Sequence, residues 1–239
     1  MLQPHEIERL LVVVAHPDDV DFSSAGTVAN LTDAGVHVTY CIVTDGEAGG
    51  SDRTMQRREM AHLRRAEQTA AAACVGVNDL VFLGHPDGRV VADLHLRRDI
   101  SRVIREVRPN VVILQSPEID YDRIFASHPD HRAAGEAALA AVYPDARNPF
   151  AFPELLADGL EPWSVREVWM TAHPTTTDVV DVTEQIDRKI AALLCHASQH
   201  PDPAAMQVRV STWMGLLATR HGLPEGRLAE GFRVVATGG

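Results

Sequence analysis

Short apolar runs alternate with helical patterns along most of the chain, and this alternation limits the possible folds more than any other feature. The apolar runs lie at about 10–15, 36–43, 80–83, 111–115, 166–171 and 178–182. Between them, apolar residues recur at helical spacing, as at 96–107 before Pro109 and at 186–197. Buried strands alternating with amphipathic helices are typical of βα units. The sequence therefore predicts an α/β fold, a Rossmann-like three-layer α/β/α sandwich with a mainly parallel sheet.

The size of the chain suits one folding unit. Its 239 residues, 45% of them hydrophobic, are enough for one substantial core. Neither a repeat nor a linker is evident, so we expect a single domain over residues 1–239. The proline-rich stretch 144–163 predicts an irregular excursion over the functional site rather than a domain boundary.

Charge and cysteine content exclude several classes of partner. The chain has 22 basic and 33 acidic residues, a net charge of −11, which argues against nucleic acid and against an anionic membrane surface. Cys41, Cys74 and Cys195 are an odd number in segments that look buried, which favours reduced thiols and a cytoplasmic protein. The run at 10–15 lacks a basic leader, so we expect neither a signal peptide nor a membrane span. The oligomeric state stays open, a homo-oligomer included.

The tripeptide His-Pro-Asp occurs four times, at 16, 85, 128 and 200. The residue that follows separates the four copies. Asp19 and His131 can bind a metal ion, whereas Gly88 and Pro203 offer no such side chain. The copies at 85 and 200 therefore predict turns, and the copies at 16 and 128 predict the two halves of one metal site.

His16, Asp19 and His131 would form a shell of two histidines and one carboxylate that leaves a position for water, an arrangement typical of hydrolases. His16 follows the predicted strand 10–15, and open α/β sheets bind ligands at the carboxyl ends of their strands. No Gly-x-Gly-x-x-Gly sequence follows that strand, which disfavours a dinucleotide site. Zn²⁺ suits these ligands, as do Fe²⁺, Co²⁺ and Mn²⁺.

A helix predicted after the second strand carries a carboxylate on its inner face. The apolar members of that face are Met60, Leu63, Ala70 and Cys74, and Glu67 falls among them. A buried carboxylate needs a partner, which Arg53, Arg57 or Arg64 could supply. Two interpretations remain open: a structural ion pair, or an arginine that reaches a hydroxyl or phosphate of a substrate.

The sequence resembles the PIG-L, or LmbE-like, zinc-dependent N-acetylglucosaminyl deacetylases over nearly its whole length. The resemblance rests on Ala15-His16-Pro17-Asp18-Asp19, Thr44-Asp45-Gly46-Glu47, Arg65-Ala66-Glu67, Leu83-Gly84 with Asp87-Gly88, His128-Pro129-Asp130-His131, and Lys189 with His196-Ala197-Ser198-Gln199. The paired metal motifs are the specific part. The family often continues Asp-Asp with Glu, where this chain has Val20 and then Asp21, so the role of Asp21 stays open.

The resemblance implies a role for each motif residue. The zinc ligands would be His16, Asp19 and His131, with Asp18 as general base and His128 as general acid. Either Asp18 or His128 would return a proton to the departing amine. Asp130 would orient a liganding imidazole or cap the backbone of its own turn.

The substrate contacts implied by the resemblance are acidic residues after the second and third strands, Glu47 and Asp87. Arg64 or Arg65 would join them. Three glycines around Glu47 indicate a loop that is mobile or closely approached; they are Gly46, Gly49 and Gly50.

The expected function is a metal-dependent hydrolase that removes the acetyl group from an N-acetylglucosamine-type sugar or conjugate, with zinc-bound water activated by Asp18. The alternatives are an amidase that acts on a thiol conjugate or natural-product precursor, and a non-catalytic metal-containing binding module. A metal-dependent phosphoesterase is less favoured, because such sites commonly need more carboxylates that bridge two ions. The sequence does not identify the aglycone.

Overall fold

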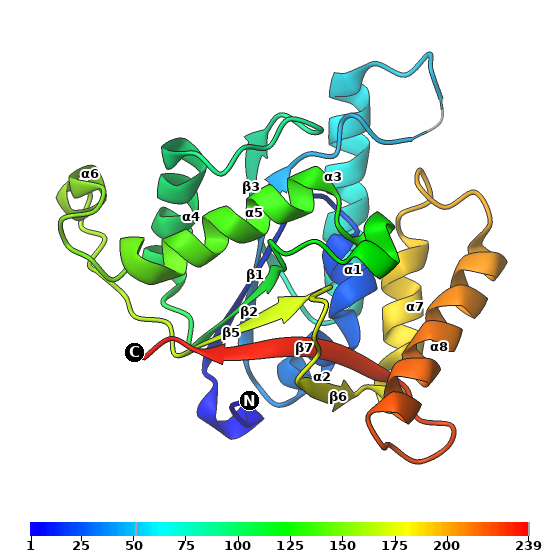
Figure 1. Cartoon of the computed structure of the whole chain (residues 1–239). Helices are drawn as coiled ribbons and strands as arrows, with labels where there is room; N and C mark the ends of the chain where they lie inside the picture. Colours follow the sequence, from blue (N-terminus) through cyan, green and yellow to red (C-terminus); the bar gives the residue numbers. More distant parts are fainter. Residues whose placement is uncertain (51, 239) are drawn as a thin grey trace.

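The computed structural model describes residues 1–50 and 52–238, which form a mixed α/β fold with helices on both faces of a seven-stranded sheet (Figure 1). The strands are β1 (Arg9–Val14), β2 (His37–Thr44), β3 (Asp79–His85), β4 (Val111–Gln115), β5 (Glu167–Thr171), β6 (Asp178–Asp181) and β7 (Ala229–Ala236), in the order β3-β2-β1-β4-β5-β7-β6. The first five strands pair in parallel, and β7 is antiparallel to β5 and β6. All six predicted strands are present. Strand β7 is not predicted from the sequence, because Glu230, Gly231 and Arg233 interrupt its apolar run.

The helices form the two outer layers. They are α1 (Asp19–Ser23), α2 (Ala25–Asp33), α3 (Arg57–Cys74), α4 (Leu94–Val107), α5 (Pro129–Ala140), α6 (Pro153–Ala157), α7 (Ile186–Leu194) and α8 (Pro203–Arg220), with short helical turns η1 (Pro4–Glu6), η2 (Tyr121–Ala126), η3 (Ala141–Asp145) and η4 (Thr183–Gln185). One core joins α1, α2, α3 and α7 to one face of the sheet, and a second joins α4 and α5 to the other (Figure 1). Helix α8 packs outside α7 through Met206, Val210 and Met214.

Strand β1 contributes to both cores, because successive side chains point to opposite faces of a strand. Leu10, Val12 and Val14 lie in the first core, and Leu11 and Val13 lie in the second. A strand covered on both faces has a continuous apolar sequence. This explains why the apolar run at 10–15 identifies the centre of the sheet.

The order of the strands determines where a ligand site can form. The chain goes outward from β1 to β2 and β3 and then returns to pair β4 with the other side of β1. The segments that follow β1 and β4 therefore separate at the carboxyl edge of the sheet, where open α/β folds bind ligands. The first carries the motif at 16 and the second leads to the motif at 128, so the topology brings the two motifs together.

Helix α3 corrects one expectation. Its inner face was expected to include Leu63 and Ala70, but both are exposed. The residues buried along α3 are Met60, Arg64, Glu67, Gln68, Ala71 and Ala72. Polar side chains occupy this face because Arg64, Glu67 and Gln68 form hydrogen bonds with neighbouring loops and turns rather than packing in the apolar core.

The stretch 144–163 is held against α4 by Arg105, whose side chain is buried. The guanidinium donates to five backbone carbonyl oxygens, those of Asp145, Ala146, Asn148, Ala151 and Leu160, at 2.9–3.4 Å. The stretch follows α5, and a helix of 12 residues separates its two ends by about 18 Å. Because the other end of α5 carries His128, the structure does not place this stretch over the site.

The cysteines agree only in part with the expectation of buried thiols. Cys41 is fully buried, whereas Cys74 and Cys195 are partly exposed, with their sulfur atoms 3.9 Å apart. All three are free. Within the described ranges, no helix combines the length and the apolar character needed to cross a membrane.

Candidate metal centre and active site

The turn after β1 aims three polar side chains into one cavity. The backbone N–H of His16 donates to Asp19 Oδ2 (2.7 Å), and Asp18 adopts the left-handed conformation with φ of 87°. Asp19 then begins α1. The cavity has a volume of about 350 Å³, and the side chains of all three residues line it together with His128 and His131.

The two imidazole nitrogens and the carboxylate oxygens of the three predicted ligands lie close to the spacing that a tetrahedral metal ion requires, with one Asp19 oxygen nearer each histidine. His16 Nδ1 is 3.2 Å from His131 Nε2 and 3.4 Å from Asp19 Oδ2, and His131 Nε2 is 3.0 Å from Asp19 Oδ1. Ligands at about 2.0–2.1 Å from a tetrahedral ion lie about 3.3 Å from one another. The three residues predicted as ligands therefore fit one zinc-sized ion.

Two further carboxylates lie behind the His16 ring. His16 Nε2 is 3.3 Å from Asp130 Oδ2 and 3.1 Å from Asp87 Oδ1. A proton on Nε2 that faces these carboxylates leaves the lone pair of Nδ1 free for a metal ion. Asp130 also accepts hydrogen bonds from the N–H groups of Gly88 (2.7 Å) and Val90 (3.3 Å). The contact expected of Asp130 to an imidazole is thus present, whereas the backbone groups that it accepts from belong to the loop after β3 and not to its own turn.

Other sets of donor atoms also converge on His16. The ligand atoms of His16, His128 and His131, and those of His16, Asp87 and Asp130, lie within 4.8 Å of one another. In the second set, backbone N–H groups already occupy the carboxylates, since Ala48 N donates to Asp87 Oδ2 (2.8 Å) in addition to the bonds at Asp130. These carboxylates are therefore better suited to support His16 than to bind an ion.

The carboxylates of Asp19, Asp87 and Asp130 place an excess of negative charge around His16. Burial lowers the pKa of His16, but the carboxylates of Asp130, Asp19 and Asp87 outweigh it and raise the pKa to about 12. Burial raises the pKa of Asp19, but the His131 and His16 imidazoles hold it well below its usual range. A proton on His16 thus balances carboxylates that a divalent cation would balance better.

Asp18 lines the same cavity as Asp19, but its neighbour is an arginine rather than two histidines. Burial raises its pKa to about 7, although the Arg64 guanidinium, with Nη2 3.1 Å from Asp18 Oδ2, lowers it. Arg64 also donates to the carbonyl oxygens of Pro17 and Gly46. A carboxylate whose pKa lies near neutrality is suited to accept a proton and return it.

His128 caps the N-terminus of α5. Its Nδ1 accepts a hydrogen bond from Asp130 N (3.2 Å), so the ring proton belongs on Nε2. Burial, together with His131 and His16, lowers the pKa of His128. The ring centroid of His128 is 5.2 Å from that of His16 and also from that of His131. A neutral imidazole with an Nε2–H group therefore stands beside the proposed metal position.

Comparison with known proteins identifies the group to which this site belongs. The profile of the PIG-L family, described as GlcNAc-PI de-N-acetylase, matches residues 11–142. The chain is 31% identical over 232 residues to the diacetylchitobiose deacetylase of Thermococcus kodakarensis, covering 97% of this chain and 84% of the relative. The chain belongs to the PIG-L family.

Two further comparisons agree with this assignment. The probable N-acetyl-alpha-D-glucosaminyl L-malate deacetylase 2 of Bacillus cereus is 33% identical over 199 residues, which cover 80% of this chain and 83% of the relative. The structure of N,N'-diacetylchitobiose deacetylase from Pyrococcus horikoshii superposes with a TM-score of 0.89 at 29% identity, covering 97% of this chain and 85% of that one. The family and the α/β fold predicted from the sequence are confirmed.

Of the four residues predicted to contact substrate, two line the cavity of the PIG-L site and two do not. Arg64 and Asp87 line the cavity. Glu47 lies behind Asp87 and accepts a hydrogen bond from its backbone N–H (2.9 Å). Arg65 points elsewhere: it forms two hydrogen bonds with Asp45, at 2.7 and 2.8 Å, and its guanidinium covers the Phe82 ring. The structure gives no support for a substrate contact by Arg65.

Glu67 has a partner that the sequence analysis did not propose. Its carboxylate accepts hydrogen bonds from the backbone N–H (2.8 Å) and hydroxyl (2.7 Å) of Ser198 rather than pairing with an arginine. The neighbouring Gln199 lines the cavity. The motif at 196–199 therefore reaches the site, although the family profile ends at residue 142. The only sequence signal for this was the resemblance of that motif to the PIG-L family.

The glycine-rich loop after β2 packs closely over the site. A Cβ atom added at Gly46 or Gly49 would overlap the Arg64 guanidinium, and one at Gly50 would overlap Met60. Of the two possibilities that the glycines indicated, close approach is the one observed.

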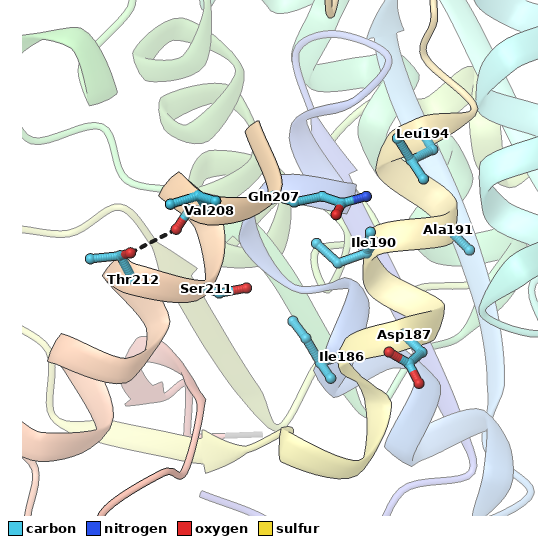
Figure 2. Close-up of a pocket in the computed structure, with 9 residues that line it drawn as sticks. All are labelled: Ile186, Asp187, Ile190, Ala191, Leu194, Gln207, Val208, Ser211 and Thr212. Atoms are coloured by element: carbon cyan, nitrogen blue, oxygen red, sulfur yellow. Dashed lines mark hydrogen bonds between the residues drawn. The ribbon is translucent and has the colours of Figure 1, made fainter. Parts of the chain in front are cut away.

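A larger groove of about 660 Å³ lies between α7 and α8 (Figure 2). Its lining contains one ionisable side chain, that of Asp187, and none of the residues predicted to act in catalysis. Functional sites require several converging polar groups in addition to volume. We therefore assign the PIG-L site to the smaller cavity.

Proposed function

We propose that this chain is a metal-dependent deacetylase that removes the acetyl group from an N-acetylglucosamine-type sugar or conjugate. One observation carries the proposal: Asp18 and His128 face the same cavity as the three ligand atoms of His16, Asp19 and His131. The relative in Thermococcus kodakarensis is named a diacetylchitobiose deacetylase and that in Bacillus cereus a probable N-acetyl-alpha-D-glucosaminyl L-malate deacetylase, which supports the substrate class.

His16, Asp19 and His131 would hold the ion, and zinc is the proposed metal because the spacing of the donor atoms suits a tetrahedral shell. Fe²⁺, Co²⁺ and Mn²⁺ share this preference for nitrogen and oxygen ligands. When bound, such an ion supplies Lewis-acid polarisation of the acetamide carbonyl and acidifies water.

Asp18 and His128 handle the protons in the proposed reaction. Asp18 takes the proton from the attacking water, and Arg64 holds the resulting carboxyl group in place. His128 donates from Nε2 to the oxygen that becomes negative as the carbonyl is attacked, because Asp130 N occupies its Nδ1. Asp18, which has gained a proton, returns it to the departing amine. His128 thus serves as a hydrogen-bond donor and Asp18 as both base and acid.

The remaining polar groups of the cavity suit hydroxyl recognition. Arg64, Asp87 and Gln199 line it from three separate segments. Charged and amide groups that converge in a small cavity select a polar substrate such as a sugar ring. We propose that these residues orient the acetamido sugar, whereas Glu47 supports Asp87.

The experiment is a substrate panel. Metal-loaded protein is incubated with N,N'-diacetylchitobiose, N-acetylglucosaminyl malate, an N-acetylated thiol conjugate and a sugar phosphate, and acetate, free amine and phosphate are measured. We expect acetate and amine in equal amounts from an N-acetyl sugar, and none after chelation of the metal. Phosphate release alone, or sugar binding without turnover, would contradict the proposal. Turnover of the thiol conjugate alone would leave an amidase of the alternative class.

A further inference from the structure

A series of buried polar side chains, called here the positioning chain, runs from His196, in the segment after α7, to the backbone of Asp18. Asp21, Gln68 and His196 are all completely buried. His196 Nε2 donates to Asp21 Oδ2 (2.9 Å), Gln68 Nε2 donates to the same oxygen (2.9 Å), and Gln68 Oε1 accepts from Asp18 N (2.7 Å). None of these three side chains takes part in the chemistry described above.

The last link of this chain acts on a strained residue. Asp18 has φ of 87°, a conformation that costs a residue with a side chain about 1–2 kcal/mol. Such conformations persist where the surroundings hold them in place. The bond from Asp18 N to Gln68 is a contact that the left-handed turn makes with α3, and the same turn directs the Asp18 carboxylate toward Arg64.

Helix α1, which carries Asp21, is held against α7 by a contact that does not involve His196. Lys189 of α7 is fully buried and donates to the carbonyl oxygens of Asp21 (2.8 Å) and Phe22 (2.7 Å) and to Glu230 (2.6 Å). Glu230 in turn accepts from the backbone at Gly26 (3.0 Å). Lys189 therefore holds α1 against α7 through the backbone of Asp21 and Phe22 without any contribution from His196. The hydrogen bond of His196 acts instead on the side chain of Asp21.

We propose that His196, Asp21 and Gln68 form a positioning chain that holds the Asp18 carboxylate in the orientation needed for proton transfer. The inference rests on the proposed function in assigning the base to Asp18. It gives a role to Asp21, which stands near the position where the family often has Glu, through its contacts with Gln68 and His196. It also gives the segment after α7 a role in the reaction.

The test compares variants matched in shape and burial. His196→Phe keeps an aromatic ring and removes the donor, whereas His196→Gln places an amide N–H near the position of Nε2. Gln68→Met removes the hydrogen bonds of Gln68 to Asp21 and to Asp18 N and keeps an unbranched side chain of similar length. Arg105→Met is the control for simple loss of stability, because Arg105 is a buried cation with no contact to the site. All are studied as zinc-loaded full-length protein.

We expect His196→Phe and Gln68→Met to lower kcat by about tenfold to a hundredfold with KM unchanged, since small displacements of a catalytic group have effects of this size. His196→Gln should recover most of the loss, and bound zinc should stay at the wild-type level. The amide of Asp18, followed by hydrogen exchange in NMR spectra, should exchange faster in both impaired variants and not in Arg105→Met.

The two arms of the test separate the inference from the function on which it rests. A wild-type protein that deacetylates no sugar of the panel would overturn the proposed function, while Asp18 exchange would still decide whether the positioning chain exists. Unchanged exchange and kcat in a folded His196→Phe or Gln68→Met would overturn the inference. So would a kcat loss in Arg105→Met as large as theirs, or an equal loss in His196→Gln. If His196→Phe does not fold, Gln68→Met alone decides.

Discussion

Asp18 and Asp19 are neighbours in the chain, but the structure gives their carboxylates different properties. Burial raises the pKa of Asp18 to about 7, whereas the His131 and His16 imidazoles overcome the effect of burial on Asp19 and lower its pKa. Two carboxylates whose pKa values are displaced in opposite directions are suited to different roles. The ionised Asp19 suits a metal ligand, and Asp18 suits a group that exchanges protons.

Replacing Asp18 with asparagine removes the proton acceptor and keeps the shape of the side chain. We expect Asp18→Asn to lower kcat by about 10²–10⁴-fold, the usual contribution of general acid-base catalysis, with bound metal unchanged. Asp45→Asn is the control, because Asp45 forms its two hydrogen bonds with Arg65 outside the cavity. Steady-state kinetics and metal analysis measure both effects. Undiminished turnover would rule out Asp18 as the base.

Asp130 lies behind His16, a proposed metal ligand, with its Oδ2 3.3 Å from His16 Nε2. We expect Asp130→Asn to weaken metal binding by about 10–100-fold, as is usual when a carboxylate that orients a liganding histidine is removed. Asp145→Asn is a matched control, since Asp145 is a buried carboxylate that pairs with Arg97 away from the site. Competition with a chromogenic chelator measures the affinity. Equal affinity in the wild type and in Asp130→Asn would contradict the support assigned to Asp130.

At the scale of elements, the site depends on short segments packed between strands and helices. Helix α1 has five residues, and the glycine-rich loop after β2 covers Arg64. Neither could be located from periodicity, because a helix of one turn or a loop has no repeating pattern. The side chains of α3 that border the site were misjudged for a related reason: a polar face toward a ligand cavity looks like an exposed face in sequence.

Gly46 provides a test at this scale. Gly46→Ala introduces a Cβ at φ of 67°, where it also overlaps Arg64. We expect a loss of stability of about 1–2 kcal/mol from the backbone and, in addition, a lower kcat/KM because Arg64 is displaced. Gly35→Ala has a similar φ of 86° with open space around it, so it should lose stability alone. Thermal unfolding and kinetics of both variants distinguish the two effects; equal kcat/KM values would contradict the packing role of Gly46.

At the scale of the whole molecule, the residues expected to act in catalysis and a cluster that contributes to stability lie in different regions around the same sheet. The carboxyl edge at β1 and β4 forms the site, whereas the stretch 144–163 at the far end of α5 is held by Arg105. A buried cation that donates several hydrogen bonds to carbonyl oxygens contributes to stability without contact with a ligand. Stability and catalysis should therefore respond to different substitutions.

Arg105→Met is the corresponding prediction. The variant leaves carbonyl oxygens of 144–163 without their charged donor, and we expect the free energy of unfolding to fall by about 3 kcal/mol, the size of one or two hydrogen bonds to a charged group. Denaturant unfolding measures the change. The kcat of the folded protein should match that of the wild type, and a reduced kcat would show that this stretch communicates with the site.

The sequence by itself determined six of the seven strands and the candidate donor atoms, because apolar runs and short motifs are local. Apolar runs identified six strands, and His-Pro-Asp followed by Asp or His identified the residues whose ligand atoms meet. Only the tertiary structure decided that Arg64 rather than Arg65 faces the cavity, that Glu67 binds Ser198, and that His196 reaches Asp21 across 175 residues. The physical reason is that these pairings depend on the rotation of a helix and on the order of the strands, which bring together side chains whose spacing along the chain carries no signal.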